Sequence, residues 1–148
     1  MSETTVSASG SASTGASVAG RARAGRIALR TLTVLLALFY GVASALPKLI
    51  AHPSAVETFG KMGWGSGAMY VIGALELAGA IGLLVPVLSG TAPVALIGLM
   101  VGAFVVQMTY FDGQNAATPL VLIVPLAVLA WRRRDRNAEL VRLVTRRA

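Results

Sequence analysis

Apolar positions along the chain gather into four long runs that are separated by short polar segments. The runs cover residues 27–50, 68–88, 93–111 and 118–131. An α-helix of roughly 20 residues crosses the ~30 Å hydrocarbon core of a bilayer, because each residue adds about 1.5 Å. The pattern therefore predicts an all-α fold, a bundle of four transmembrane helices.

A short amphipathic helix is expected between the first and second spans. Residues 54–57, Ser-Ala-Val-Glu, match a capping box, and Gly63 suits the end of a helix. Glu57 and Lys61 stand at i and i+4, where they can pair. One face is apolar and consists of Val56, Phe59 and Met62. With Trp64 as an interface anchor, this helix is predicted to lie on the outer membrane surface.

Turn signals predict the other span boundaries. Residues 89–92, Ser-Gly-Thr-Ala, indicate a tight hairpin, and Pro93 fits the first turn of the third span. Thr118 and Pro119 are the expected N-cap and first residue of the fourth span. Beyond it, residues 135–147 can form a basic amphipathic helix.

Composition divides the chain into three parts. Residues 1–25 are rich in Ser, Ala and Gly and lack apolar periodicity, so we expect a disordered cytoplasmic tail. Residues 26–134 contain the four spans and form the membrane domain. Residues 135–148 form a basic, amphipathic cytoplasmic tail.

The formal charge of +7 comes from 13 basic and 6 acidic residues, and its distribution argues against nucleic-acid binding. Eleven basic residues lie before Thr31 or after Trp131. Basic flanks of this kind stay in the cytoplasm, so both termini are expected there. The start of the chain also resembles a secretory signal, with Ala43-Ser44-Ala45 as a cleavage site that would leave three spans. We favour a retained first span, because its polar stripe then has partners in later spans.

The chain has no cysteine and one histidine, His52. These counts exclude disulfides, thiol nucleophiles, iron–sulfur clusters, thiolate zinc sites and bis-histidine haem ligation within one chain. We therefore expect no metal and no haem. A redox role would need a dissociable carrier such as a quinone, or a partner subunit that holds the redox centre.

Glu76 is the one acidic residue in its apolar run, which contains no basic residue, and it marks a candidate site. A charged side chain at membrane depth costs roughly 2.5–3.5 kcal/mol on insertion scales, so such residues usually have a function or a partner. Small residues, Gly73, Gly79 and Ala80, share its helix face. Because small residues allow close helix contact, Glu76 is predicted to point into the bundle.

Other spans supply polar groups near the outer end. Tyr40, Ser44 and Lys48 recur at every fourth position, and Gln107 and Tyr110 stand at i and i+3. Cα–Cβ bonds tilt toward each helix's amino terminus, so Lys48 and Glu76 converge and are predicted to pair. The predicted polar pocket consists of Tyr40, Ser44, Lys48, Glu76, Gln107 and Tyr110.

Structural alternatives stay open for each of these residues. Glu76 can be a protonated carboxyl group that hydrogen bonds within the bundle, and Lys48 can reach the interface with its ammonium. Tyr40 and Tyr110 can be packing or interface aromatics. Gly98-x-x-x-Gly102 is expected to be a close-approach site, either within the chain or in a dimer.

The chain resembles the DoxX-like family of small four-span bacterial membrane proteins. The resemblance rests on a first span that ends in Lys48, the short amphipathic segment 52–63, and the glycine-rich segment 73–82 with its single glutamate. It covers about residues 26–134.

This resemblance implies a place in the bacterial cell membrane and a link to redox chemistry. Named relatives include small subunits of a thiosulfate:quinone oxidoreductase and membrane parts of a redox-stress complex. The chain is thus expected to be an accessory subunit that is no autonomous enzyme, with a non-covalently bound quinone as candidate cofactor. Its expected partners are the lipid bilayer and a redox protein or a second copy of the chain. The alternatives are a non-enzymatic membrane partner or assembly factor, and a small proton- or cation-coupled permease.

Overall fold

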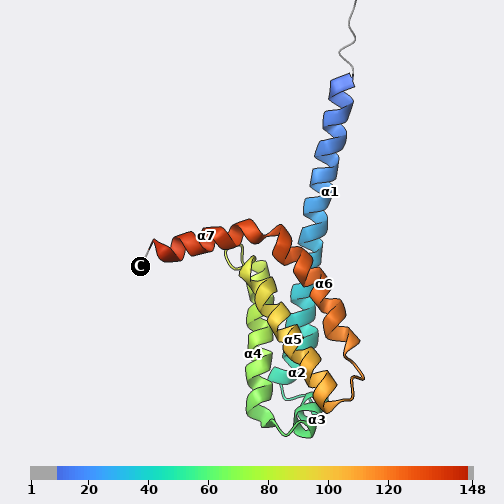
Figure 1. The fold of residues 1–148 in the computed structure, drawn as a ribbon, viewed down its shortest axis with the longest axis vertical. Coiled ribbons are helices and arrows are strands. Elements are labelled where there is room, and N and C mark those ends of the chain that lie inside the picture. The colour runs from blue at the N-terminus through green and yellow to red at the C-terminus, as the bar shows by residue number, and fades with distance from the viewer. Residues whose placement is uncertain (1–9, 147–148) are drawn as a thin grey trace, which may run out of the picture. The chain divides into compact units, whose positions relative to one another are not determined.

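The computed structural model describes residues 10–146, which are helical apart from short connections and contain no strand (Figure 1). Side chains are described from residue 15 onward, except those of residues 136, 137, 139, 140 and 143. Two compact units separate at residue 31, namely residues 1–31 and 32–148. The elements are α1 (Gly10–Leu38), the π-helix η1 (Phe39–Ala45), α2 (Leu46–Leu49), α3 (Pro53–Lys61), α4 (Gly65–Leu84), α5 (Thr91–Tyr110), α6 (Ala117–Arg132) and α7 (Arg134–Thr145).

In the first unit, the described residues belong to α1, whereas the sequence predicted a disordered tail over residues 1–25. Residues 1–9 lie outside the described part of the chain. Alanine and arginine are strong helix formers, and adding residues to an existing helix avoids the cost of nucleation. The segment can therefore be helical without burying an apolar face.

The first span contains a π-helical turn next to Pro47. Pro47 has no N–H, and its ring collides with the carbonyl of residue i−4 in a regular α-helix. Here the N–H of Leu46 donates to the carbonyl oxygen of Gly41, which is a wider i to i−5 bond. The wider turn brings positions four residues apart nearer to one line, so Tyr40, Ser44 and Lys48 face the same side.

The amphipathic helix α3 forms between the first two long helices, as predicted, but its cap differs. Its N-cap is His52, whose Nδ1 accepts a hydrogen bond from the N–H of Ser54 at 3.4 Å. The predicted capping box is wrong because the helix begins at Pro53, one residue before Ser54. Glu57 pairs with Lys61 at 2.8 Å, and this hydrogen bond and the lysine charge lower the pKa of Glu57.

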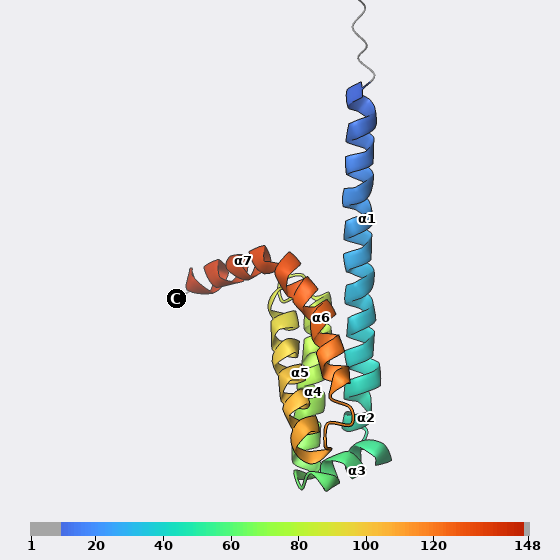
Figure 2. The same cartoon turned by 45° about the vertical axis from the view of Figure 1, so that its right-hand side comes forward.

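The apolar face of α3 packs against the start of α4. Phe59 and Met62 are buried together with Met69, whereas Val56 is about half exposed. Partly buried residues around them include Val106 and Phe111 at the end of α5. Figure 2 shows α3 lying across this end of the bundle.

The connection between α4 and α5 is longer than predicted. α4 spans Gly65–Leu84 rather than residues 68–88, and a turn over residues 85–90 replaces the hairpin at 89–92. The cause is Pro86, because the residue before a proline is driven out of the helical region. Val85 accordingly adopts an extended conformation, with ψ of 119°.

The last apolar helix, α6, is shorter than the other three. The continuous helix Gly15–Leu49 and helices α4 and α5 are long and apolar enough to cross a membrane. α6 has 16 residues, about 24 Å at 1.5 Å per residue, and contains Pro125. It begins at Ala117, so Thr118 is not its N-cap and Pro119 is not its first residue.

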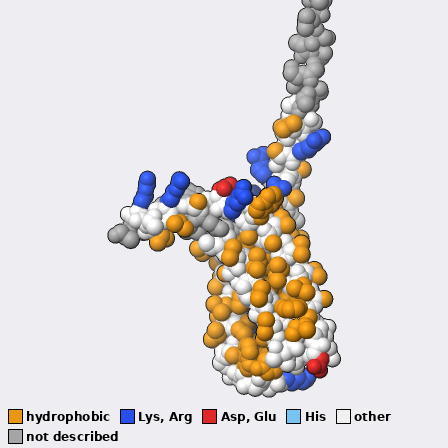
Figure 3. All heavy atoms as spheres, viewed as in Figure 1, with side chains coloured by type: hydrophobic (Ala, Val, Ile, Leu, Met, Phe, Trp, Pro, Cys, Tyr) orange, Lys and Arg blue, Asp and Glu red, His pale blue; other side chains and the backbone are white. Residues whose placement is uncertain are grey.

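The helices of the second unit form a bundle with an apolar outer surface. α4 packs against η1, α2 and α5, and α5 packs against α6. The core includes Tyr40, Met69, Leu83, Leu96, Leu126 and Leu129, all essentially inaccessible. Figure 3 shows hydrophobic side chains over the outside of the bundle as well. An apolar exterior on apolar helices is what contact with lipid requires.

Candidate functional site: an ion pair beside an apolar cavity

The predicted ion pair between Lys48 and Glu76 is confirmed by the structure. Lys48 Nζ lies 2.9 Å from Glu76 Oε2. The ammonium also donates to the backbone oxygen of Ser44 at 2.9 Å and to its Oγ at 3.2 Å. Glu76 is only 5% exposed, whereas the Lys48 side chain retains 19% exposure. The charge of the acid is thus compensated within the bundle.

Glycines on the face of Glu76 make this contact possible. A Cβ atom on Gly73 would lie 2.9 Å from Lys48 Cβ and 3.3 Å from the backbone oxygen of Ala45. A Cβ on Gly79 would lie 2.5 Å from Leu96 Cδ2 in α5. These separations are shorter than ordinary carbon contacts. The predicted role of the small residues in close helix packing is therefore confirmed.

A partly open cavity of about 1020 Å³ lies next to the ion pair. Its walls come from η1 and α2, from α3, from α4 and α5, and from the loop and first turns of α6. The lining is mainly apolar. Its polar members include Tyr40, Ser44, Lys48, Glu76 and Gln107, five of the six residues of the predicted pocket.

Two polar atoms at this cavity are buried without a hydrogen-bond partner among the described residues: the Tyr40 hydroxyl oxygen and Gln107 Oε1. Tyr40 is wholly inaccessible, and its ring meets Phe39 edge to face. Most buried polar groups in proteins are paired, so an orphan atom indicates a missing partner such as water or a ligand. The arrangement suits a molecule that carries both a hydrogen-bond acceptor and a donor.

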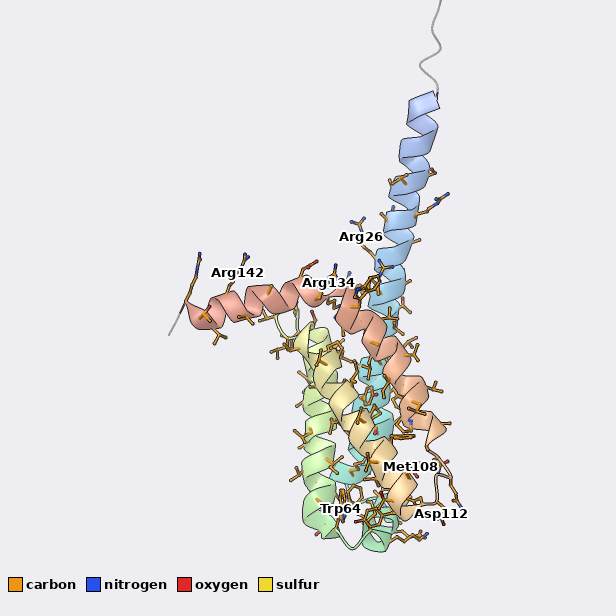
Figure 4. All side chains as sticks on the ribbon, in the orientation of Figure 1. Arg26, Trp64, Met108, Asp112, Arg134 and Arg142 are labelled. Carbon is orange, nitrogen blue, oxygen red and sulfur yellow. The ribbon has the colours of Figure 1, made fainter. Side chains whose placement is uncertain are left out.

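Tyr110, the sixth residue of the predicted pocket, lies outside the cavity lining. Trp64 Nε1 donates to its hydroxyl at 3.3 Å, and the two rings meet edge to face. Both side chains are more than 40% exposed, as expected of aromatics at a membrane interface. Figure 4 shows Trp64 at the α3 end of the bundle.

Several cavity residues were not predicted from the sequence. Thr58, Phe59 and Met62 come from α3, and Asn115 comes from the loop before α6. The apolar face of α3 was visible in the sequence, but nothing local showed which helix end it covers. Gly98 and Gly102 also line the cavity, and no heavy atom lies within 4 Å of a Cβ placed on either. The prediction that they form a close-approach site within the chain is therefore wrong.

A second polar cluster holds the opposite end of the bundle. Arg133 Nη2 donates to Thr33 Oγ1 at 2.6 Å, and Nη1 donates to the backbone oxygens of Leu83 and Ser89 at 3.4 Å. Thr33 and Ser89 are buried. One guanidinium group therefore connects α1, the end of α4 and the turn that follows it, which favours a structural role.

The chemistry at the ion pair is that of binding and proton exchange. The described residues contain no group of three His, Cys, Asp or Glu side chains arranged to hold a metal ion. The cavity offers one ammonium, one carboxyl, one phenol and the two amides of Gln107 and Asn115 along an apolar wall. These groups can bind and orient an uncharged, partly polar molecule and can exchange a proton with it.

Comparison with known proteins places this site within one family. Residues 31–129 match the DoxX-like family, and this range includes every residue that lines the cavity. No curated protein and no solved structure matches the chain. The match covers well over half of the chain and agrees with the apolar helices and the glutamate-bearing glycine face. The chain therefore belongs to the DoxX-like family.

Proposed function

We propose that this multi-pass membrane protein binds a quinone-like, lipid-soluble carrier in its cavity and serves a partner redox protein as an accessory subunit. The main support is the Tyr40 hydroxyl, which is fully buried at the cavity without a partner in the described residues. A phenol in this position donates readily to a carbonyl oxygen. A quinone supplies such an oxygen on an otherwise apolar ring.

The other polar groups match the reduced and oxidised forms of the headgroup. Gln107 Oε1 can accept a hydrogen bond from a quinol hydroxyl, whereas the Lys48 ammonium already donates to Ser44 and Glu76 and acts on the headgroup through its charge. Glu76 Oε2, held by Lys48 at 2.9 Å, is a site where a proton can be taken up or released. A bound quinone would supply two-electron redox chemistry, while these residues bind it and move its proton.

The cavity walls suit an aromatic headgroup. Phe39, Phe59, Trp64 and Phe111 line it and offer aromatic faces and edges. Aromatic rings stack on one another with a gain of about 0.5–1.5 kcal/mol beyond burial. The walls therefore favour a flat ring over a hydrated ion, which argues against the permease hypothesis.

Electron transfer requires a second protein under this proposal. The chain has no cysteine, and its one histidine caps α3 on the surface. With these residues the chain has no means of its own to ligate an electron-carrying metal centre. A partner would deliver or remove electrons, and both termini would lie in the cytoplasm, where the basic flanks are expected.

Fluorescence provides a direct test, because Trp64 lines the cavity and the other tryptophan, Trp131, does not. In a Trp131→Phe background, the protein in lipid nanodiscs would be titrated with decylbenzoquinone. We expect saturable quenching of Trp64. Tyr40→Phe should weaken binding by roughly three- to tenfold, because one hydrogen bond contributes about 0.5–1.5 kcal/mol.

Tyr70→Phe is the matched control, since Tyr70 is exposed on α4 and does not line the cavity. It should leave the dissociation constant unchanged. Quenching that rises linearly with quinone concentration and is the same in all three proteins would refute the proposal.

A further inference from the structure

The cavity extends far beyond the space that a headgroup needs. Its lining along α5 runs from Gln107 to Thr91, a distance of roughly 24 Å at 1.5 Å per residue. The ion pair and Gln107 lie toward the α3 end. Near the other end the polar lining on α5 is Thr91, whose hydroxyl already donates to the Leu88 backbone oxygen at 3.1 Å. The cavity is thus polar toward one end and apolar along the rest.

Two glycines widen this apolar part. Gly98 and Gly102 are exposed on α5, and a Cβ atom on either would meet no heavy atom within 4 Å. They differ in this from Gly73, Gly79 and Gly82, where an added Cβ would lie 2.5–2.9 Å from a neighbouring helix. Helix packing within the chain therefore explains why glycine is needed at positions 73, 79 and 82. It does not explain the glycines at positions 98 and 102.

We propose that this apolar part, the tail groove, holds the long hydrocarbon tail of the ligand whose headgroup binds beside Lys48 and Glu76. The tail groove is lined by Gly82, Thr91, Ala95, Gly98, Leu99 and Gly102. This inference rests on the proposed function and narrows the ligand to a polyprenyl quinone. Gly98 and Gly102 are then the residues that determine which tails are accepted.

The continuity of the cavity favours a tail over a helix from a second copy of the chain. The same cavity is lined by Lys48, Glu76 and Gln107, whose polar side chains suit the headgroup of a small ligand better than an apolar helix face. The tail groove also follows the axis of α5. A tail in it would lie along the membrane normal, as neighbouring lipid chains do.

The groove is expected to discriminate between ligands by the space that it leaves for their tails. Lipid chains are as apolar as the groove wall, so a tail gains little by moving from one to the other. The groove matters because a bound headgroup must have space for the chain attached to it. Filling the groove should therefore exclude ligands with tails and spare a ligand without one.

The test compares two ligands in the Trp131→Phe protein with Trp64 as the reporter. One is tetramethylbenzoquinone, which has no tail, and the other is a polyprenyl quinone. Gly98→Leu and Gly102→Leu should weaken binding of the polyprenyl quinone by roughly tenfold or more, because overpacking a filled site is strongly unfavourable. Binding of the tail-free quinone should stay within about twofold of the parent protein.

Gly67→Leu is the matched control, because Gly67 is an exposed helical glycine on α4 with open space around it and lies outside the cavity. Circular dichroism checks folding, and all three changes replace glycine with a better helix former. If both groove variants bind the polyprenyl quinone and the tail-free quinone as tightly as the parent protein does, the tail groove is refuted and the proposed function stays intact. Failure of the parent protein to bind either quinone would overturn both.

A second copy of the chain is the rival occupant. If the parent protein is a dimer in detergent and both groove variants are monomers, the glycines form a helix–helix contact and the tail groove is refuted. If the oligomeric state is the same in all variants, while only the tailed ligand loses affinity, the tail groove is supported.

Discussion

Replacing Lys48 should destabilise the bundle more than replacing its ion-pair partner Glu76. In Lys48→Met the Glu76 carboxyl loses its one hydrogen-bond partner in the described part of the chain, at a site only 5% exposed. Removing one member of a buried ion pair costs about 3–5 kcal/mol. In Glu76→Gln the ammonium keeps both Ser44 contacts and some exposure. The loss there should be about 1.5–3 kcal/mol, the contribution of a hydrogen bond to a charged group.

The double mutant separates the interaction from the individual losses. We expect a coupling energy of about 1–3 kcal/mol between the two positions. The assay is reversible unfolding by sodium dodecyl sulfate in mixed micelles, followed by circular dichroism of the helices. High salt should change the coupling little, because buried pairs are poorly screened.

The chain contains its own control for burial. Glu57 and Lys61 lie 2.8 Å apart, close to the 2.9 Å of the buried pair, but both side chains are more than 60% exposed. Single and double substitutions of Glu57 and Lys61, measured in the same way, should show no measurable coupling energy at moderate salt. Additive effects at Lys48 and Glu76, or equal coupling in the two pairs, would refute the view that burial makes the Lys48–Glu76 contact strong.

Three further predictions follow from single contacts. Gly73→Ala should destabilise the bundle by about 1–3 kcal/mol, because its Cβ would lie 2.9 Å from Lys48 Cβ, and unfolding as above measures it. Arg133→Lys should lose about 1–3 kcal/mol in the same assay, since an ammonium cannot reproduce the forked contacts, and Arg142→Lys on the exposed tail should be neutral. Reporter fusions at Ala148 and at residue 60 should give cytoplasmic and external signals, and an amino terminus at residue 46 in the mature protein would contradict this topology.

Local sequence pattern determines most of the helical fold of this protein. Apolar runs separated by short polar segments need no knowledge of packing to indicate helices, because each backbone group bonds within its own helix. The same holds for the amphipathic face of α3 and for the Glu57–Lys61 pair, which depend on residues one turn apart. The errors occur where two local signals compete. Pro86 ends α4 within an apolar run, and Pro53 moves the cap of α3 to His52.

The sequence also indicated the ion pair, for a physical reason. A lone carboxyl among apolar residues must find a partner, and Lys48 was the one cation expected at a similar depth. What the sequence could not show was the space around the pair. Gly73 and Gly98 look alike in the chain, yet one is pressed against α2 and the other faces the cavity.

Only the tertiary structure decided that difference, because a cavity is defined by where the helices leave space. α3 covers one end of the cavity, α4 and α5 leave a groove along its length, and the wide turn before Pro47 aims Tyr40 inward. Tyr110, which shares a helix face with Gln107, lies on the surface beside Trp64, because α3 brings that tryptophan to the end of α5. Helix periodicity gives the direction of a side chain from its own axis, but packing between helices determines what it meets there.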